Sequence, residues 1–296
     1  LAQKTTGYVH KIGSCAASYA DKFLLTMLFL IPIYLVIGAF AGFLAGLFGV
    51  GGGLILVPVY YYTLSWIYPE ATSLMQVSLG TALSTIVVTG MSSVRAHAVR
   101  GNVSTYILYR LAPGIAIGAA ASAVIADYLD SGFLKAFFGV MIIGLAGIMA
   151  YGTEKIKSFA AYPSIIISNI CGVLIGCLSG LLGIGGAALS VPYMSFFKTE
   201  MRQAVGTASA LGLFISIPSS IGFIIMGWGQ DVGLPYMLGY IFLPGWITVI
   251  CMTSISAVYG ARVAHGLDQK KLKRIFALLM LVIASIVICD ELLAAF

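Results

Sequence analysis

Charged residues are scarce in this sequence of 296 residues, of which aspartate, glutamate, lysine and arginine together make up only 9%. A soluble domain carries about 25% of such residues, so this chain cannot cover a globular surface that faces water. Hydrophobic residues reach 60%, and several apolar stretches have the roughly 20 residues that a helix needs to cross a bilayer. The composition therefore excludes a soluble protein and indicates a helical membrane protein.

Groups that serve catalysis or metal binding are also scarce. The five cysteines form no CxxC pair and have no neighbouring histidine, so we expect no metal site. No GxxxxGK[ST] motif occurs, and Gly183-Ile-Gly-Gly-Ala-Ala188 only loosely fits a dinucleotide-binding fingerprint and has no preceding strand. An intramembrane hydrolase built on Ser179 would lack a histidine base in an apolar segment. We therefore expect no enzyme, no metal site and no nucleotide site.

Apolar length divides the chain into about ten helical segments in two sets of five. The segments expected in the first half are 24–48, 54–66, 72–95, 103–127 and 133–151. Those expected in the second half are 163–183, 187–197, 203–226, 235–260 and 272–289. We interpret residues 1–22 as a polar N-terminal arm, 23–152 as the first transmembrane repeat, 153–162 as a linker and 163–296 as the second repeat.

Two motifs occur in both halves and in the same order. The stretch Gly46-Leu-Phe-Gly-Val-Gly-Gly-Gly-Leu-Ile-Leu-Val-Pro58 returns as Gly180-Leu-Leu-Gly-Ile-Gly-Gly-Ala-Ala-Leu-Ser-Val-Pro192. Farther along, Met75-Gln-Val-Ser-Leu-Gly-Thr-Ala82 returns as Met201-Arg-Gln-Ala-Val-Gly-Thr-Ala208. Internal repeats indicate a duplicated architecture. We therefore expect an all-α polytopic membrane protein made of two five-helix repeats with glycine-broken helices.

The distribution of loop charge indicates that the two repeats are inverted. Basic residues gather after the third helix of the first half and after the fourth helix of the second, whereas the counterpart loops are mainly acidic or uncharged. These basic residues are Arg95, His97, Arg100, Arg262, Lys270, Lys271, Lys273 and Arg274. Because cytoplasmic loops are enriched in lysine and arginine, this exchange predicts opposite orientations and an extracytoplasmic C-terminus. The lysines of the N-terminal arm do not follow this rule.

The two glycine-rich breaks are candidate anion-binding elements. Unwound backbone inside a bilayer occurs where protein or a water-filled cavity satisfies its polar groups, and a helix that starts there leaves about four unpaired amides and a partial positive charge. Two such starts, brought together by a pseudo-two-fold axis, would hold a small anion. The glycines concerned are Gly49, Gly51, Gly52, Gly53, Gly183, Gly185 and Gly186. The alternative is that they only allow close helix packing.

Polar side chains near the breaks complete the candidate site. They are Gln76, Thr81, Arg95 and Arg110 in the first half and Arg202 and Thr207 in the second. Threonine hydroxyls at matched positions can donate to an oxyanion, but they can also bond their own helix backbone. An arginine beside the pathway would bind an anion through two hydrogen bonds, or it would extend to the membrane surface.

These motifs resemble those of the TauE/SafE (TSUP) family of sulfite and organosulfonate membrane transporters. The resemblance rests on the glycine-rich stretches at 46–58 and 180–192 and the Gly-Thr-Ala steps at 80–82 and 206–208. It implies secondary transport of small sulfur-containing anions, such as sulfite, thiosulfate or sulfoacetate, across the plasma membrane without a cofactor. By motif match it assigns the anion site to the seven glycines with Thr81 and Thr207. One departure is Ala187, which stands where the first half has Gly53.

The sequence therefore predicts a transporter, and more specifically an exporter, in which one half rocks against the other around a small oxyanion. The expected partners are that anion and the lipid bilayer, with no nucleic acid. Association of several copies is left open. An anion channel and a membrane scaffold that transports nothing are the two alternatives that remain.

Overall fold

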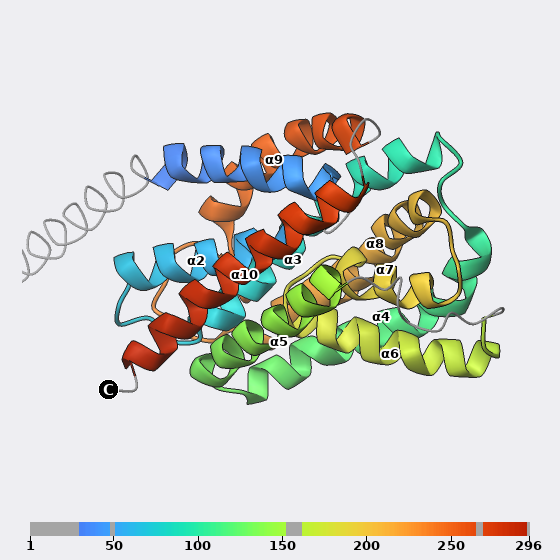
Figure 1. The fold of residues 1–296 in the computed structure, drawn as a ribbon. Helices are drawn as coiled ribbons and strands as arrows, with labels where there is room; N and C mark the ends of the chain where they lie inside the picture. Colours follow the sequence, from blue (N-terminus) through green and yellow to red (C-terminus); the bar gives the residue numbers. More distant parts are fainter. Residues whose placement is uncertain (1–29, 48–50, 152–161, 265–268, 295–296) are drawn as a thin grey trace, which may run out of the picture.

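The computed structural model describes residues 30–47, 51–151, 162–264 and 269–294 and is almost entirely helical (Figure 1). The helices are Leu30–Leu47, α2 (Gly53–Ile67), α3 (Leu74–Ala98), α4 (Thr105–Tyr128), α5 (Ser131–Tyr151), α6 (Ile165–Leu181), α7 (Ala187–Phe196), α8 (Met201–Met226), α9 (Leu243–Ala264) and α10 (Gln269–Ala294). Two short strands, β1 (Met237–Leu238) and β2 (Ile241–Phe242), pair antiparallel. Six of the described helices are long and apolar enough to cross a membrane. The prediction of an all-α polytopic membrane protein is thus confirmed.

The start of the ninth helix differs from the sequence prediction. That helix was expected over 235–260, but α9 begins only at Leu243 because the preceding residues form the hairpin of β1 and β2. Gly233, Tyr236 and Gly239 have φ values of 77°, 56° and 57°, which a right-handed helix does not allow. Hydropathy records the apolar side chains of this hairpin but not its backbone conformation, so the prediction was wrong here.

Two short helices, α2 and α7, follow the two glycine-rich breaks. They have 15 and 10 residues, and each carries a proline at its sixth position, Pro58 in α2 and Pro192 in α7. Proline lacks an N–H group, so both short helices lack the same backbone hydrogen-bond donor at their sixth position. The repeated motif therefore builds the same local structure twice.

Contacts at the helix ends show that the two repeats are inverted. The amide of Phe242, the residue before α9, donates to Thr81 Oγ1 in the first half of α3 at 3.0 Å. The Tyr240 hydroxyl donates to Asp127 Oδ1 at 2.7 Å, so α9 also begins where α4 ends. The Ser104 amide, just before α4, donates to Thr207 Oγ1, near the start of α8, at 2.9 Å. The equivalent helices α3 and α8 therefore begin at opposite ends of the molecule.

Helices of the two repeats interleave. α4 packs against α6 and α8 of the other repeat, and α9 packs against α3 and, through glycines, against Leu30–Leu47. A Cβ added at Gly42 would lie 2.5 Å from Thr253 Cα, and one at Gly118 would overlap the Val173 carbonyl oxygen. Small residues let membrane helices approach this closely. Neither repeat therefore forms a separate body.

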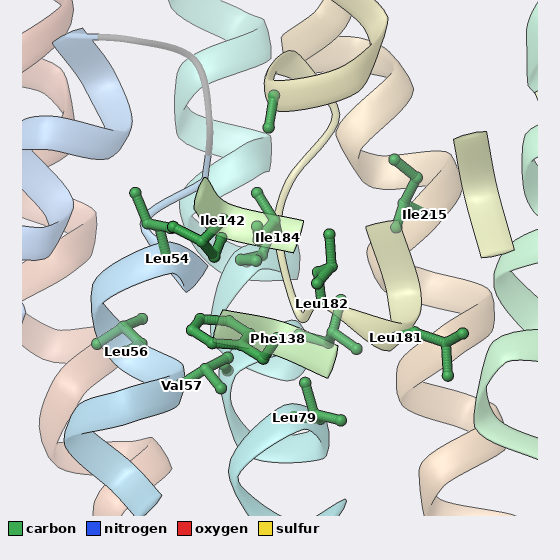
Figure 2. Close-up of a cluster of buried hydrophobic side chains, with 14 of the residues drawn as sticks. Leu54, Leu56, Val57, Leu79, Phe138, Ile142, Leu181, Leu182, Ile184 and Ile215 are labelled. Atoms are coloured by element: carbon green, nitrogen blue, oxygen red, sulfur yellow. The ribbon is translucent and has the colours of Figure 1, made fainter. Parts of the chain in front are cut away.

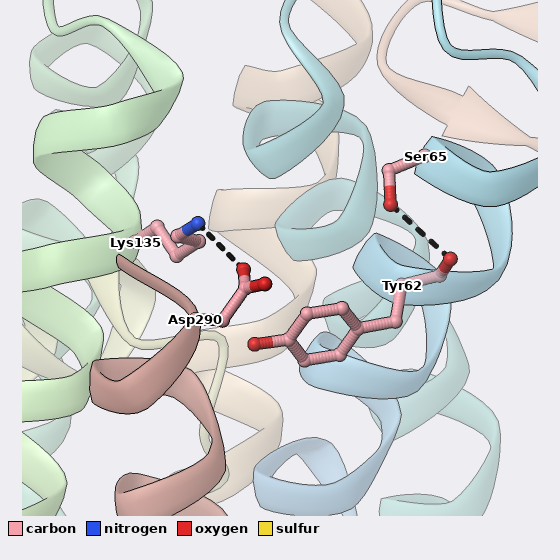
Figure 3. A network of polar contacts seen from close by, with 4 residues as sticks. All are labelled: Tyr62, Ser65, Lys135 and Asp290. Carbon is pink, nitrogen blue, oxygen red and sulfur yellow. Dashed lines mark hydrogen bonds and ion pairs between the residues drawn. The ribbon is translucent and has the colours of Figure 1, made fainter. Parts of the chain in front are cut away.

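α5 and α10 pack mainly against each other, and α10 also contacts α2. Their ends are joined by an ion pair between Lys135 Nζ and Asp290 Oδ2 at 2.9 Å (Figure 3). The Lys135 ammonium also lies 5.3 Å from the ring centroid of Tyr61 in α2. The Lys135 side chain is 8% exposed and that of Asp290 is 47% exposed, so the cation is the buried member of the pair.

Candidate functional site

The two glycine-rich breaks meet inside the fold. A Cβ added at Gly51 would lie 3.4 Å from Gly185 Cα, and one at Gly53 would overlap the Gly183 carbonyl oxygen. Gly51 and Gly52 have φ values of 78° and 79°, and that of Gly183 is 60°. These are conformations that glycine adopts without steric cost. The chain therefore turns back at both breaks while the two backbones touch.

A small cavity lies where the breaks meet. The described residues that line it are Ala45, Gly51, Ile86, Thr89, Gly90, Ser93, Gly185, Gly186, Ser209 and Gly212. Its volume of about 10 Å³ is close to the space that one water molecule needs. None of these described lining residues is charged, so the polar groups that they contribute are backbone groups and three hydroxyls.

The three hydroxyls connect α3 with α8 and with the first break. Ser93 Oγ donates to Ser209 Oγ at 3.3 Å, and Ser209 Oγ donates to the carbonyl oxygen of Val205 at 3.0 Å. Thr89 Oγ1 lies 3.5 Å from the Gly51 carbonyl oxygen. A hydroxyl hydrogen can rotate toward another acceptor. These three side chains are therefore able to donate to an oxyanion that enters the cavity.

Both short helices begin beside this cavity. α2 starts at Gly53, two residues after the lining residue Gly51, and α7 starts at Ala187, directly after the lining residue Gly186. The first amides of a helix have no partner within that helix, and its N-terminus carries a partial positive charge. A Cβ added at Gly186 would lie 2.7 Å from Gly212 N, so the start of α7 is fixed against α8. Two helix N-termini at one uncharged cavity favour an anion.

Apolar side chains surround the meeting breaks. Phe138 of α5 is 1% exposed, and Leu182 of the second break is fully buried. Figure 2 shows Phe138 with Val57 of α2 and Leu79 of α3 in the same buried cluster. Electrostatic interactions are stronger in such surroundings than in water. The apolar cluster therefore increases the effect of the helix N-termini on an anion.

The structure brings six of the seven predicted glycines together at the breaks. Those that line the cavity are Gly51, Gly185 and Gly186, and those that adjoin it in the same breaks are Gly52, Gly53 and Gly183. Gly49 lies outside the described residues. Ala187, where the second motif departs from the first, is 4% exposed and occupies the first position of α7.

The predicted threonines and glutamine hold the helix ends and do not line the cavity. Thr81 Oγ1 accepts from the Phe242 amide at 3.0 Å, and Thr207 Oγ1 accepts from the Ser104 amide at 2.9 Å. Each threonine therefore fixes the chain before the fourth helix of the opposite repeat. Gln76 donates from Nε2 to two carbonyl oxygens at the end of α4, at 3.2 and 2.7 Å. A contact of these side chains with substrate stays a prediction.

The three predicted arginines also lie away from the cavity lining. Arg95 and Arg202 are exposed, Arg95 in the last turn of α3 and Arg202 in the first turn of α8. The Arg110 guanidinium donates to the Pro163 carbonyl and lies 4.5 Å from the ring centroid of Tyr106. In this conformation none of the three arginines lines the cavity, and a contact of these side chains with substrate stays a prediction.

Sequence reasoning did not assign the hydroxyls of Thr89, Ser93 and Ser209 to the site. Ile86, Thr89, Gly90 and Ser93 all line the cavity and stand at spacings of three, four and seven along α3, which places them on one helix face. That periodicity was the available signal. Only the packing of α8 against α3 identifies this face as the one that meets the breaks.

Comparisons with known proteins agree with a transporter. The sequence model of the family described as "Sulfite exporter TauE/SafE" matches residues 34–287. A "Probable membrane transporter protein" of Haemophilus influenzae is 34% identical over 86% of this chain and 96% of its own length. A protein of the same description from Methanocaldococcus jannaschii is 24% identical over 82% of this chain and 88% of its own length.

No solved structure matches the chain. The Haemophilus influenzae relative, which is named as a membrane transporter, nevertheless matches 86% of the chain. The six long apolar helices give the described part of the chain the architecture of a multi-pass membrane protein. With the family model matched over residues 34–287, the chain belongs to the sulfite exporter TauE/SafE family and is a membrane transporter rather than an enzyme.

Proposed function

We propose that this protein is a secondary transporter that exports small sulfur-containing anions, such as sulfite, thiosulfate or two-carbon sulfonates like sulfoacetate. The observation that carries the proposal is the meeting of the starts of α2 and α7 at one cavity with the hydroxyls of Thr89, Ser93 and Ser209. Helix N-termini and hydroxyls are donors that suit the oxygen atoms of a sulfite or sulfonate group. The description of the matching family, which names sulfite export, supports the same class of substrate.

The size of the cavity supports transport by alternating access over conduction through an open channel. A volume of about 10 Å³ accommodates about one water molecule, whereas sulfite has one sulfur and three oxygen atoms. The anion therefore enters only after the helices around the cavity separate. A transporter that alternates between two closed-off conformations requires such a step.

The charges at the two ends of the molecule support an orientation in the plasma membrane. The described charged residues at the end where α4 and α8 begin are mainly basic: Arg95, Arg100, Arg110, Lys198, Glu200, Arg202 and Arg262. Those at the other end are mainly acidic: Glu70, Asp127, Asp130, Lys135, Asp231 and Asp290. Under the positive-inside rule the first end lies in the cytoplasm, and the C-terminus lies outside.

Ligand binding and transport by purified protein test the proposal. Sulfite, thiosulfate or a two-carbon sulfonate should raise the melting temperature, because a ligand that binds only the folded state stabilises it, and liposomes that contain the protein should transport the same anion. Absence of stabilisation and transport with all three would refute the proposed substrate class.

Alanine variants locate the binding site. Ser93→Ala should weaken anion binding about tenfold, which corresponds to one lost hydrogen bond of about 1.4 kcal/mol. Ser92→Ala is the matched control, because Ser92 lies next to Ser93 on α3 but bonds the Val88 carbonyl and does not line the cavity. Equal dissociation constants for the two variants would contradict the assignment of the cavity.

A further inference from the structure

Four buried serines of the second repeat, Ser179, Ser190, Ser216 and Ser220, have a hydroxyl without a hydrogen-bond partner among the described residues. Ser179 at the end of α6 is 1% exposed, and Ser216 in α8 is fully buried. Neither lines the cavity described above. Burial of an unpaired hydroxyl is unfavourable, so buried polar groups without a partner call for an explanation.

The internal repeat pairs two of these serines, Ser179 and Ser216, with residues of the cavity. Superposition of the two glycine-rich motifs pairs Ser179 with Ala45, and superposition of the two Gly-Thr-Ala motifs pairs Ser216 with Gly90. Ala45 and Gly90 both line the cavity. Ser179 and Ser216 therefore occupy the pseudo-symmetric counterpart of the cavity wall.

A third serine belongs to the same counterpart position. Ser219 is paired by the repeat with Ser93, which lines the cavity. Gly180 follows Ser179 at the end of α6. A Cβ added at Gly180 would lie 2.9 Å from Ser219 Oγ, so Ser219 packs against this end of α6. Ser219 Oγ donates to the Ala119 carbonyl at 2.8 Å. The counterpart position thus contains hydroxyls from two helices.

The cavity and its counterpart position carry equal numbers of hydroxyls, although the residues that supply them differ. Where the cavity has Thr89 and Ser209, the repeat places Ile215 and Leu83, which cannot donate. Serines at the counterparts of Ala45 and Gly90 replace the two lost donors. The counterpart position therefore keeps three hydroxyl donors, Ser179, Ser216 and Ser219.

We propose that Ser179, Ser216 and Ser219 line a second anion subsite, which opens when the cavity lined by Ser93 closes. This inference rests on the proposed anion transport. In an inverted repeat, the second conformation is obtained when the two halves exchange their local arrangements. The unpaired serines of the present conformation are then the donors that the anion meets in the other one.

The positions of the two subsites along α8 agree with this sequence of events. Ser209 lies nearer the start of α8, at the arginine-rich end, and Ser216 lies seven residues farther along the helix. Seven residues correspond to about 10 Å of helix rise. Ser219 lies one turn closer to the acidic end. The anion therefore passes from a subsite displaced toward the cytoplasmic face to one displaced toward the outer face.

Cysteine labelling from each side of the membrane tests the proposal. In the full chain with its native cysteines replaced, single variants Ser93→Cys, Ser216→Cys and Ser220→Cys are exposed to a membrane-impermeant sulfonated thiosulfonate reagent in right-side-out and inside-out vesicles. Ser220 is the matched control, because its side chain is also buried, with 6% exposure, and its hydroxyl also has no partner among the described residues. Its repeat counterpart, Val94, does not line the cavity.

We expect Ser93→Cys to react from the arginine-rich face, Ser216→Cys from the opposite face, and Ser220→Cys several-fold more slowly than both. Sulfite should slow the first two reactions. Reaction of Ser216→Cys at the rate of Ser220→Cys, or from the same face as Ser93→Cys, would overturn the second subsite. Opposite sidedness without protection by any sulfur anion would instead overturn the proposed substrate class and leave the two subsites in place.

Alanine variants provide a second readout that does not depend on labelling. Ser216→Ala should slow sulfite transport several-fold in liposomes, whereas Ser220→Ala should transport at the wild-type rate. Size-exclusion profiles check that both variants are folded. A folded Ser216→Ala variant with wild-type transport would also overturn the proposal.

Discussion

Replacement of Thr81 by valine separates its structural role from the substrate role that the sequence predicts. Valine has nearly the same shape as threonine, so Thr81→Val removes the hydroxyl without creating a large cavity. The side chain is fully buried, and its Oγ1 accepts from the Phe242 amide at 3.0 Å. The substitution therefore leaves a buried amide without its acceptor at the start of α9.

The magnitude follows from the cost of that amide. An unsatisfied buried donor costs about 1–3 kcal/mol, so Thr81→Val should lower the free energy of unfolding by this amount. Thr207→Val removes the acceptor of the Ser104 amide, 2.9 Å away, and should have a smaller effect, because Ser104 is only partly buried and water can replace the lost acceptor. Because the two bonds lie at opposite ends of the molecule, the two losses should add in the double variant.

Equilibrium unfolding in mixed detergent micelles measures the loss, and titration of the folded protein with sulfite measures binding. The dissociation constant of the folded variants should equal that of the wild type, since neither threonine lines the cavity. Thr81→Ser is the control that keeps the hydroxyl, and it should retain more stability than Thr81→Val. Wild-type stability combined with weaker sulfite binding would refute the structural role and support direct contact with substrate.

Two further changes test the packing of the fold. Asp290→Asn weakens the pairing of the Lys135 ammonium, whose side chain is 8% exposed, whereas Lys135→Met leaves a carboxylate that is 47% exposed. The free energy of unfolding in micelles should fall by about 1–3 kcal/mol for Asp290→Asn and by less than about 1 kcal/mol for Lys135→Met. A larger loss for Lys135→Met would contradict the burial of the cation. Gly186→Ala would place its Cβ against the carbonyl oxygen of Ala208 and 2.7 Å from Gly212 N. Because these are backbone atoms of α8 that cannot move aside easily, the yield of folded protein in size-exclusion chromatography should fall. Gly144→Ala, where an added Cβ meets nothing within 4 Å, should give the wild-type yield, and equal yields for the two variants would show that the contact at α7 is not required.

The fold class and the glycine breaks were accessible from the sequence because their signals are local. Apolar length identifies membrane helices, and runs such as Gly51-Gly-Gly53 interrupt a helix wherever they occur. The repeat of the motif then indicated two such breaks. The hairpin before Leu243 was missed for the complementary reason, since its apolar residues give the same hydropathy signal whether the backbone is helical or extended.

The side chains of the site were less accessible because their roles depend on contacts between distant helices. Thr81 and Thr207 stand at matched positions, and both accept from a backbone amide in the structure. A threonine that binds substrate and one that accepts from a backbone amide are the same residue in the sequence, so the matched positions alone do not distinguish these roles. The contact of Ser93 with Ser209 depends on the register of α3 against α8. That register is set by tertiary packing and is not encoded in either helix alone.

The interleaved packing also restricts how the alternating access that we propose can occur. If one sequence repeat rocked as a rigid body, α4 would separate from α6, where a side chain at Gly118 would already overlap the Val173 carbonyl. The same motion would separate α9 from Leu30–Leu47 at the Gly42 contact with Thr253. Close backbone contacts of this kind hold helices together over long stretches. The moving bodies must therefore each contain helices of both repeats, and the glycine breaks, where the hydrogen-bonded helices are already interrupted, are the places where those bodies can shift against one another.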